Sequence, residues 1–133
     1  MKTLIVEDEF TSRALLREIL KRYGVPQTAV NGKEAVEAVS AAIEAGEPFD
    51  LICLDIMMPE MDGQEALLRI RRLEAEAAIA DDKRARVIMT TALADKNTVL
   101  QAIQGQCDYF LVKPIDSRAL LDELRRMKLI PQA

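Results

Sequence analysis

The sequence alternates between short apolar runs and longer segments of helical periodicity, and this alternation limits the fold more than any other feature. The apolar runs cover 3–6, 25–30, 51–54, 87–90 and 109–112. The segments that follow them repeat apolar side chains at helical spacing over 10–22, 33–44, 64–77, 96–104 and about 116–127. Strands that alternate with helices form a parallel sheet covered on both faces. We therefore predict an α/β fold, a doubly wound five-stranded parallel sheet of order 2-1-3-4-5.

The length of the chain indicates a single domain. It has 133 residues, half of them hydrophobic, which is enough for one core of ordinary size. We expect one domain over 1–133, with its core at about 3–127. Within it, Pro26 places the second strand at or near a sheet edge, because proline cannot donate to a strand ladder. Leu67, Leu68 and Leu73 are expected to face inward from the third helix.

Composition excludes several classes of function. The formal net charge is −4, which argues against nucleic acid as a direct partner. No apolar run reaches the length of a membrane helix and the N-terminus does not have the pattern of a signal peptide, so a cytoplasmic protein is expected. The chain contains no histidine, which excludes a phosphohistidine carrier, a histidine base and histidine metal ligands. Cys53 and Cys107 are interpreted as reduced core thiols.

Polar side chains gather where the predicted strands end. Glu7 and Asp8 end the first strand, Asp55 the third, Thr91 the fourth and Lys113 the fifth. In an open parallel sheet, ligands bind outside the carboxyl ends of the strands, where the strand order reverses. Three carboxylates that meet there repel one another. A hard divalent cation such as Mg²⁺ would remove this repulsion.

Four segments, VEDE, LDIMMPEMDG, TTALAD and LVKP, occur in this order along the chain. In this combination the sequence resembles the receiver domain of two-component response regulators over about residues 3–127. The resemblance implies a flavodoxin-like fold. It also implies that Asp55 accepts a phosphoryl group, and that the protein is a phosphoacceptor signalling domain rather than an enzyme.

The resemblance assigns roles to the other strand-end residues. Glu7 and Asp8 match the acidic pair that holds Mg²⁺, or Mn²⁺ in its place, together with Asp55 and the backbone carbonyl of Met57. Thr91 matches the hydroxyl that binds a phosphoryl oxygen. Lys113 matches the catalytic lysine, and its bond to Pro114 is expected to be cis.

The resemblance also implies an output. Thr91 would move toward the phosphoryl group, and Phe110 would change rotamer with it; the alternative is that Phe110 is an ordinary core residue. The signalling surface would be the fourth helix, fifth strand and fifth helix. The expected partners are a sensor histidine kinase or phosphotransfer protein, and a downstream protein or a second copy of the chain.

Other residues decide between related functions. Met57 and Leu93 stand two residues after Asp55 and Thr91, where an apolar side chain cannot orient water, so slow autodephosphorylation is expected. An aspartyl-phosphate phosphatase would need an acid at position 57. Asp62 is expected to have a loop or helix-cap role rather than a catalytic one. Two further alternatives are a receiver excised from a longer regulator or hybrid kinase, which Met1 and the absence of a trailing linker argue against, and a pseudo-receiver that binds partners without phosphorylation.

Overall fold

The computed structural model describes residues 1–58, 60–92 and 95–132, so the expectation for Leu93 lies outside the described residues. Strands and helices alternate along the whole of this part. Their order is β1 (Thr3–Val6), α1 (Phe10–Leu20), η1 (Lys21–Tyr23), β2 (Gln27–Ala29), α2 (Gly32–Glu44), β3 (Leu51–Asp55), α3 (Gly63–Glu76), η2 (Asp81–Lys83), β4 (Arg86–Thr91), α4 (Lys96–Gln104), β5 (Tyr109–Val112) and α5 (Ser117–Arg126).

The strands in the described residues form one parallel sheet of order β2-β1-β3-β4-β5, which confirms the predicted fold. The chain adds β2 on one side of β1 and then β3, β4 and β5 on the other. The order therefore reverses between β1 and β3, where such folds bind ligands. The edge position of β2 is confirmed, but the strand is shorter than the predicted run 25–30. Pro26 lies before it, because proline cannot donate to the ladder.

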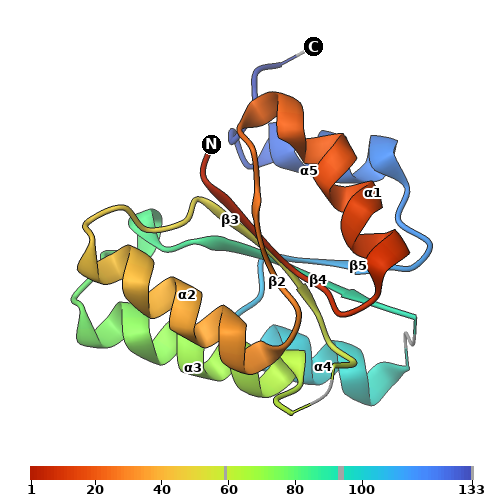
Figure 1. Cartoon of the computed structure of the whole chain (residues 1–133). Helices are drawn as coiled ribbons and strands as arrows, with labels where there is room; N and C mark the ends of the chain where they lie inside the picture. Colours follow the sequence, from red (N-terminus) through yellow and green to blue (C-terminus); the bar gives the residue numbers. More distant parts are fainter. Residues whose placement is uncertain (59, 93–94, 133) are drawn as a thin grey trace.

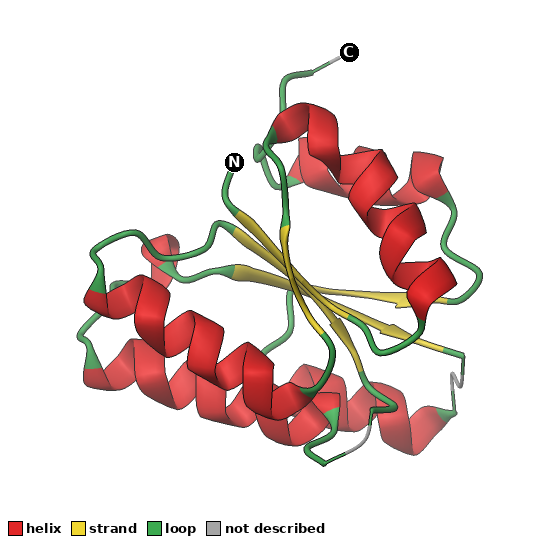
Figure 2. Cartoon of the chain, viewed as in Figure 1, coloured by secondary structure: helices red, strands yellow, loops and turns green. Residues whose placement is uncertain are grey.

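The helices cover both faces of the sheet (Figures 1 and 2): α1 and α5 lie on one face, and α2, α3 and α4 on the other. Successive strand residues point to opposite faces, so each strand feeds two cores. In β4, Val87 and Met89 join the core under α2, α3 and α4, whereas Ile88 joins the core under α1 and α5. No helix in the described part of the chain is long and apolar enough to cross a membrane.

Two predictions about individual side chains have different outcomes. Cys53 and Cys107 are both free thiols, as expected, and they pack against opposite cores. The inward placement of Leu68 is wrong, because its side chain is 56% exposed. The buried stripe of α3 runs at helical spacing through Leu67, Ile70, Arg71 and Glu74 and passes beside Leu68.

Arg71 is the centre of a buried ionic network at the end of the sheet away from the strand carboxyl ends. Its guanidinium donates to Glu74 Oε1 at 2.8 Å, to the Ala85 carbonyl at 2.8 Å and to Asp108 Oδ2 at 3.0 Å. Two more hydrogen bonds reach the Gln106 carbonyl, at 2.9 and 3.1 Å. The network joins α3 to the start of β4 and to the turn between α4 and β5.

Candidate functional site

The strand-end residues predicted from the sequence lie at one edge of the sheet. Glu7 directly follows β1, which pairs with β3 through Val6 and Leu54. Asp55 ends β3 and pairs in register with Thr90 of β4. Because neighbouring parallel strands end together, side chains as distant in the sequence as Glu7 and Asp55 meet at this edge.

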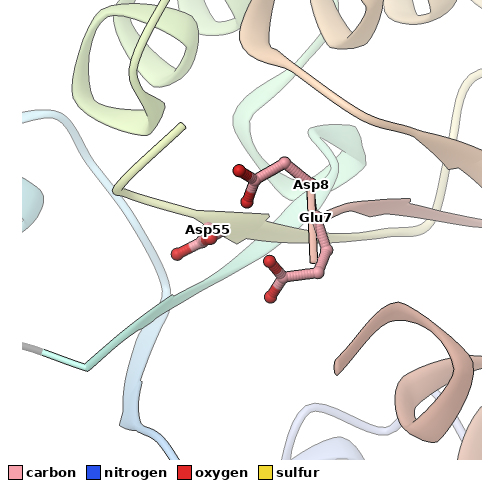
Figure 3. Close-up of side chains that lie close together, drawn as sticks. All are labelled: Glu7, Asp8 and Asp55. Carbon is pink, nitrogen blue, oxygen red and sulfur yellow. The ribbon is translucent and has the colours of Figure 1, made fainter. Parts of the chain in front are cut away.

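The carboxylates of Glu7, Asp8 and Asp55 form an acidic cluster (Figure 3). One oxygen from each lies within 4.8 Å of the others. Oxygens on opposite sides of a bound Mg²⁺ lie about 4 Å apart, since each is about 2.0–2.1 Å from the ion. Glu7 and Asp55 are 0% and 2% exposed, whereas Asp8 is exposed to solvent. The cluster therefore fits a hard cation that is held from one side and open to solvent on the other.

Lys113 compensates part of the charge of the two buried carboxylates. Its Nζ lies 2.6 Å from Glu7 Oε1 and 3.3 Å from Asp55 Oδ2. Burial alone would lower the pKa of Lys113, but the hydrogen bond to Glu7 and the charges of both acids outweigh it, so the pKa is raised. The lysine is therefore a fixed cation. This positive charge helps to explain why β3 can end in a buried carboxylate, Asp55.

One lysine does not balance two buried acids. Burial raises the pKa of Glu7 from 4.5 to about 7; Lys113 opposes this rise, whereas the neighbouring Asp55 adds to it. A carboxyl whose pKa rises on folding contributes stability below pH 4.5 that is lost as the pH increases through about 7. The side chains of the site alone thus hold more negative charge than the protein readily accommodates near neutral pH.

The other residues predicted for the site surround this centre. Thr91 is fully buried at the end of β4, and its carbonyl accepts a 2.7 Å hydrogen bond from the Lys113 N–H. The Lys113–Pro114 peptide bond is cis, as expected. Met57 is 59% exposed on the loop after β3, and its N–H donates to Asp55 Oδ1 at 3.4 Å. Phe110 lies within β5, three residues before Lys113, and is half-buried against the core under α2, α3 and α4.

Asp62 has a structural position, as expected. Its side chain caps α3 by accepting the Glu65 N–H at 2.9 Å. The next residue, Gly63, packs so closely under the site that a Cβ there would overlap the Asp55 carbonyl oxygen. Glycine at this position lets α3 start directly against the end of β3.

Sequence reasoning missed one contact of the acidic pair. Arg13 of α1 donates from Nη1 to the carbonyl oxygens of Glu7 at 2.9 Å and Asp8 at 3.3 Å. No sequence signal pointed to this contact, because it depends on how α1 turns back over the end of β1.

Comparison with known proteins identifies the family and agrees with the fold. The family model described as the response regulator receiver domain matches residues 3–125. The chain belongs to this family. Phosphorylation on an aspartate with Mg²⁺ is typical of its members, which are signalling domains rather than conventional enzymes.

Individual relatives cover nearly the whole chain. The chemotaxis protein CheY of Bacillus subtilis is 35% identical over 127 residues, which cover 94% of this chain and 95% of the relative. A CheY from Borrelia burgdorferi, solved as a CheX–CheY–BeF₃–Mg²⁺ complex, is 31% identical with a TM-score of 0.78, covering 99% of this chain and 90% of that one. The receiver domain of the Arabidopsis thaliana histidine kinase CKI1, complexed with Mg²⁺ and BeF₃⁻, is 30% identical with a TM-score of 0.79. That match covers 96% of this chain and 89% of the other.

Proposed function

We propose that Asp55 accepts a phosphoryl group from a phosphohistidine of a sensor kinase or phosphotransfer protein. The observation that carries the proposal is the position of Asp55: it is buried in the acidic cluster, with Lys113 Nζ 3.3 Å from one of its oxygens. An Asp55 oxygen would form a bond to phosphorus while the bond from phosphorus to the donor nitrogen breaks. A carboxylate oxygen is itself the nucleophile, so its attack needs no general base.

The obstacle to this reaction is charge, since an anion attacks an anionic group. Lys113 places one cation beside Asp55. Glu7, Asp8, Asp55 and the Met57 carbonyl would hold Mg²⁺ or Mn²⁺, which supplies positive charge for the oxygens of the phosphoryl group. Thr91 would donate its hydroxyl to one of those oxygens. Catalysis by this site consists of positioning and charge stabilisation.

The mass of the intact protein tests this proposal. Incubation with a small-molecule phosphodonor such as acetyl phosphate is expected to add one phosphoryl group with Mg²⁺ and almost none with a chelator. The same experiment without a kinase tests the site itself, because the donor needs no protein partner. An unchanged mass under conditions that label ordinary receivers would favour a pseudo-receiver that acts without phosphorylation.

Mg²⁺ affinity is expected to depend on pH through Glu7. The pKa of Glu7 is about 7, so below that pH its carboxyl group must lose a proton before it can help to bind the metal. Affinity is expected to fall by about tenfold for each pH unit below that value, as measured by titration calorimetry or by amide chemical shifts.

Glu7→Gln is the control for this dependence. The variant should bind Mg²⁺ more weakly but lose the change near pH 7, since the amide does not titrate. A wild-type affinity that stays constant while the pH falls from two units above the Glu7 pKa to one unit below it would contradict the prediction.

The output surface that we propose is α4, β5 and α5. Three large apolar side chains stand exposed on it, Leu100 at 44%, Ile103 at 62% and Val112 at 46%. Exposed apolar groups in this number support binding to a protein, either a downstream target or a second copy. The rotamer change of Phe110 stays a prediction. Its ring signals should shift when beryllofluoride, which stands in for the phosphoryl group, is added with Mg²⁺.

Two further expectations follow from the same function. Slow autodephosphorylation stays a prediction, supported by the apolar residue at position 57, Met57, whose backbone N–H donates to Asp55 Oδ1. A cytoplasmic location, with a single domain over the chain, is proposed from the expected kinase partner and from the family match over 3–125.

A further inference from the structure

We propose that Arg13 is a positioning residue, which holds the β1–α1 turn so that Glu7 and Asp8 present their carboxylates to one cation. The inference rests on the proposed function, because it concerns the same metal site. It adds a residue that touches neither the metal nor the phosphoryl group. Two hydrogen bonds support this role, both from Arg13 Nη1, to the carbonyls of Glu7 and Asp8.

The turn needs such a contact because it is short and strongly acidic. Three consecutive acids, Glu7, Asp8 and Glu9, separate β1 from α1. Glu9 caps α1 by accepting the Ser12 N–H at 3.2 Å, and the Glu9 N–H donates to Glu7 Oε2 at 3.2 Å. Like charges this close repel one another, which favours opening of the turn. A guanidinium between the two carbonyls opposes this opening.

Arg13 and Lys113 contact different groups of the site: Arg13 contacts backbone carbonyls, whereas Lys113 contacts carboxylates. Lys113 takes one oxygen of Glu7 and approaches one of Asp55. Arg13 brings a second positive charge to the turn without occupying a carboxylate oxygen of either residue. It therefore lowers the repulsion while leaving oxygen ligands available to a metal.

Arg13 is itself held in place by its own helix. The Arg13 Cζ lies 5.7 Å from the centre of the Phe10 ring, and the two residues are three positions apart on α1. Residues at this spacing lie on the same side of a helix. A guanidinium over an aromatic ring is attracted to it. The contact also gives a role to Phe10, whose side chain is 74% exposed.

Arg13→Met tests the inference, because methionine keeps much of the length of the side chain and removes its donors and charge. Arg17→Met is the matched control: it makes the same change one turn along α1, and the Arg17 side chain has no hydrogen bond or ion pair to the described residues. Arg13→Met is expected to weaken Mg²⁺ binding about tenfold relative to Arg17→Met, as removal of an outer-shell partner does at other metal sites. Arg13→Lys should recover part of the affinity.

A second readout needs no metal. In the metal-free protein, Arg13→Met is expected to speed hydrogen exchange at the Glu9 amide, which donates to Glu7, while the midpoint of urea unfolding matches that of Arg17→Met. Equal Mg²⁺ affinities in the two methionine variants would overturn the role of Arg13 and leave the proposed function standing. Absence of Mg²⁺ binding by the wild-type protein would overturn the metal site and this inference together.

Discussion

Asp55→Asn is expected to abolish phosphoryl addition, reducing the labelled fraction by more than about a thousandfold, because the variant lacks the nucleophile that forms the covalent bond. Asparagine has nearly the same shape as aspartate, so the fold should persist. The substitution also removes a charge and a hydrogen bond that raise the pKa of Glu7. Intact mass after incubation with acetyl phosphate and Mg²⁺ measures the loss of labelling.

Asp62→Asn is the matched control for this substitution. It makes the same chemical change on the loop that leads from β3 to α3, and asparagine caps a helix as well as aspartate does. The control should be labelled like the wild-type protein. Labelling of Asp55→Asn at the wild-type level would mean that another carboxylate, with exposed Asp8 the nearest candidate, accepts the phosphoryl group.

The candidate site was predictable from sequence because it depends on topology rather than on fine packing. Once the βα alternation indicated a parallel sheet, Asp55 and Lys113 had to lie at the same edge, whatever helices separated them in the sequence. The helix cap at Asp62 was predictable for a similar reason, since it involves only neighbouring residues. Features that depend on strand order or on neighbouring residues could therefore be predicted from the sequence.

Contacts between side chains and distant backbone were not predictable in this way. Glu7 was expected to bind the metal, and its side chain also forms a 2.6 Å ion pair with Lys113 that the sequence did not indicate. The hydrogen bonds of Arg13 depend on the direction of α1 over the sheet. In α3, hydrophobicity favoured Leu68 as an inward residue, whereas the buried stripe contains the charged Arg71. Composition cannot reveal that the guanidinium of a buried arginine donates hydrogen bonds to carbonyl oxygens from distant parts of the chain.

Arg71→Met is expected to lower the free energy of unfolding by about 3–5 kcal/mol, because it removes one partner from a buried ionic network. Arg71 is 8% exposed, and its loss leaves the buried carboxylate of Glu74 without its cation. Glu74 Oε2 still accepts the Ala85 N–H at 2.8 Å, which holds the uncompensated charge inside the protein. Urea unfolding measures the change.

Arg69→Met gives the comparison on the same helix. Arg69 pairs with Glu65, but both side chains are 51% exposed, so the loss should be within about 1 kcal/mol. Addition of Glu74→Gln to Arg71→Met should recover part of the stability, since the amide removes the buried charge and still accepts from Ala85. If Arg71→Met cost no more than Arg69→Met, the network would not hold the turn before β5 in place. Its five hydrogen bonds would then be a consequence of the fold rather than a cause of its stability.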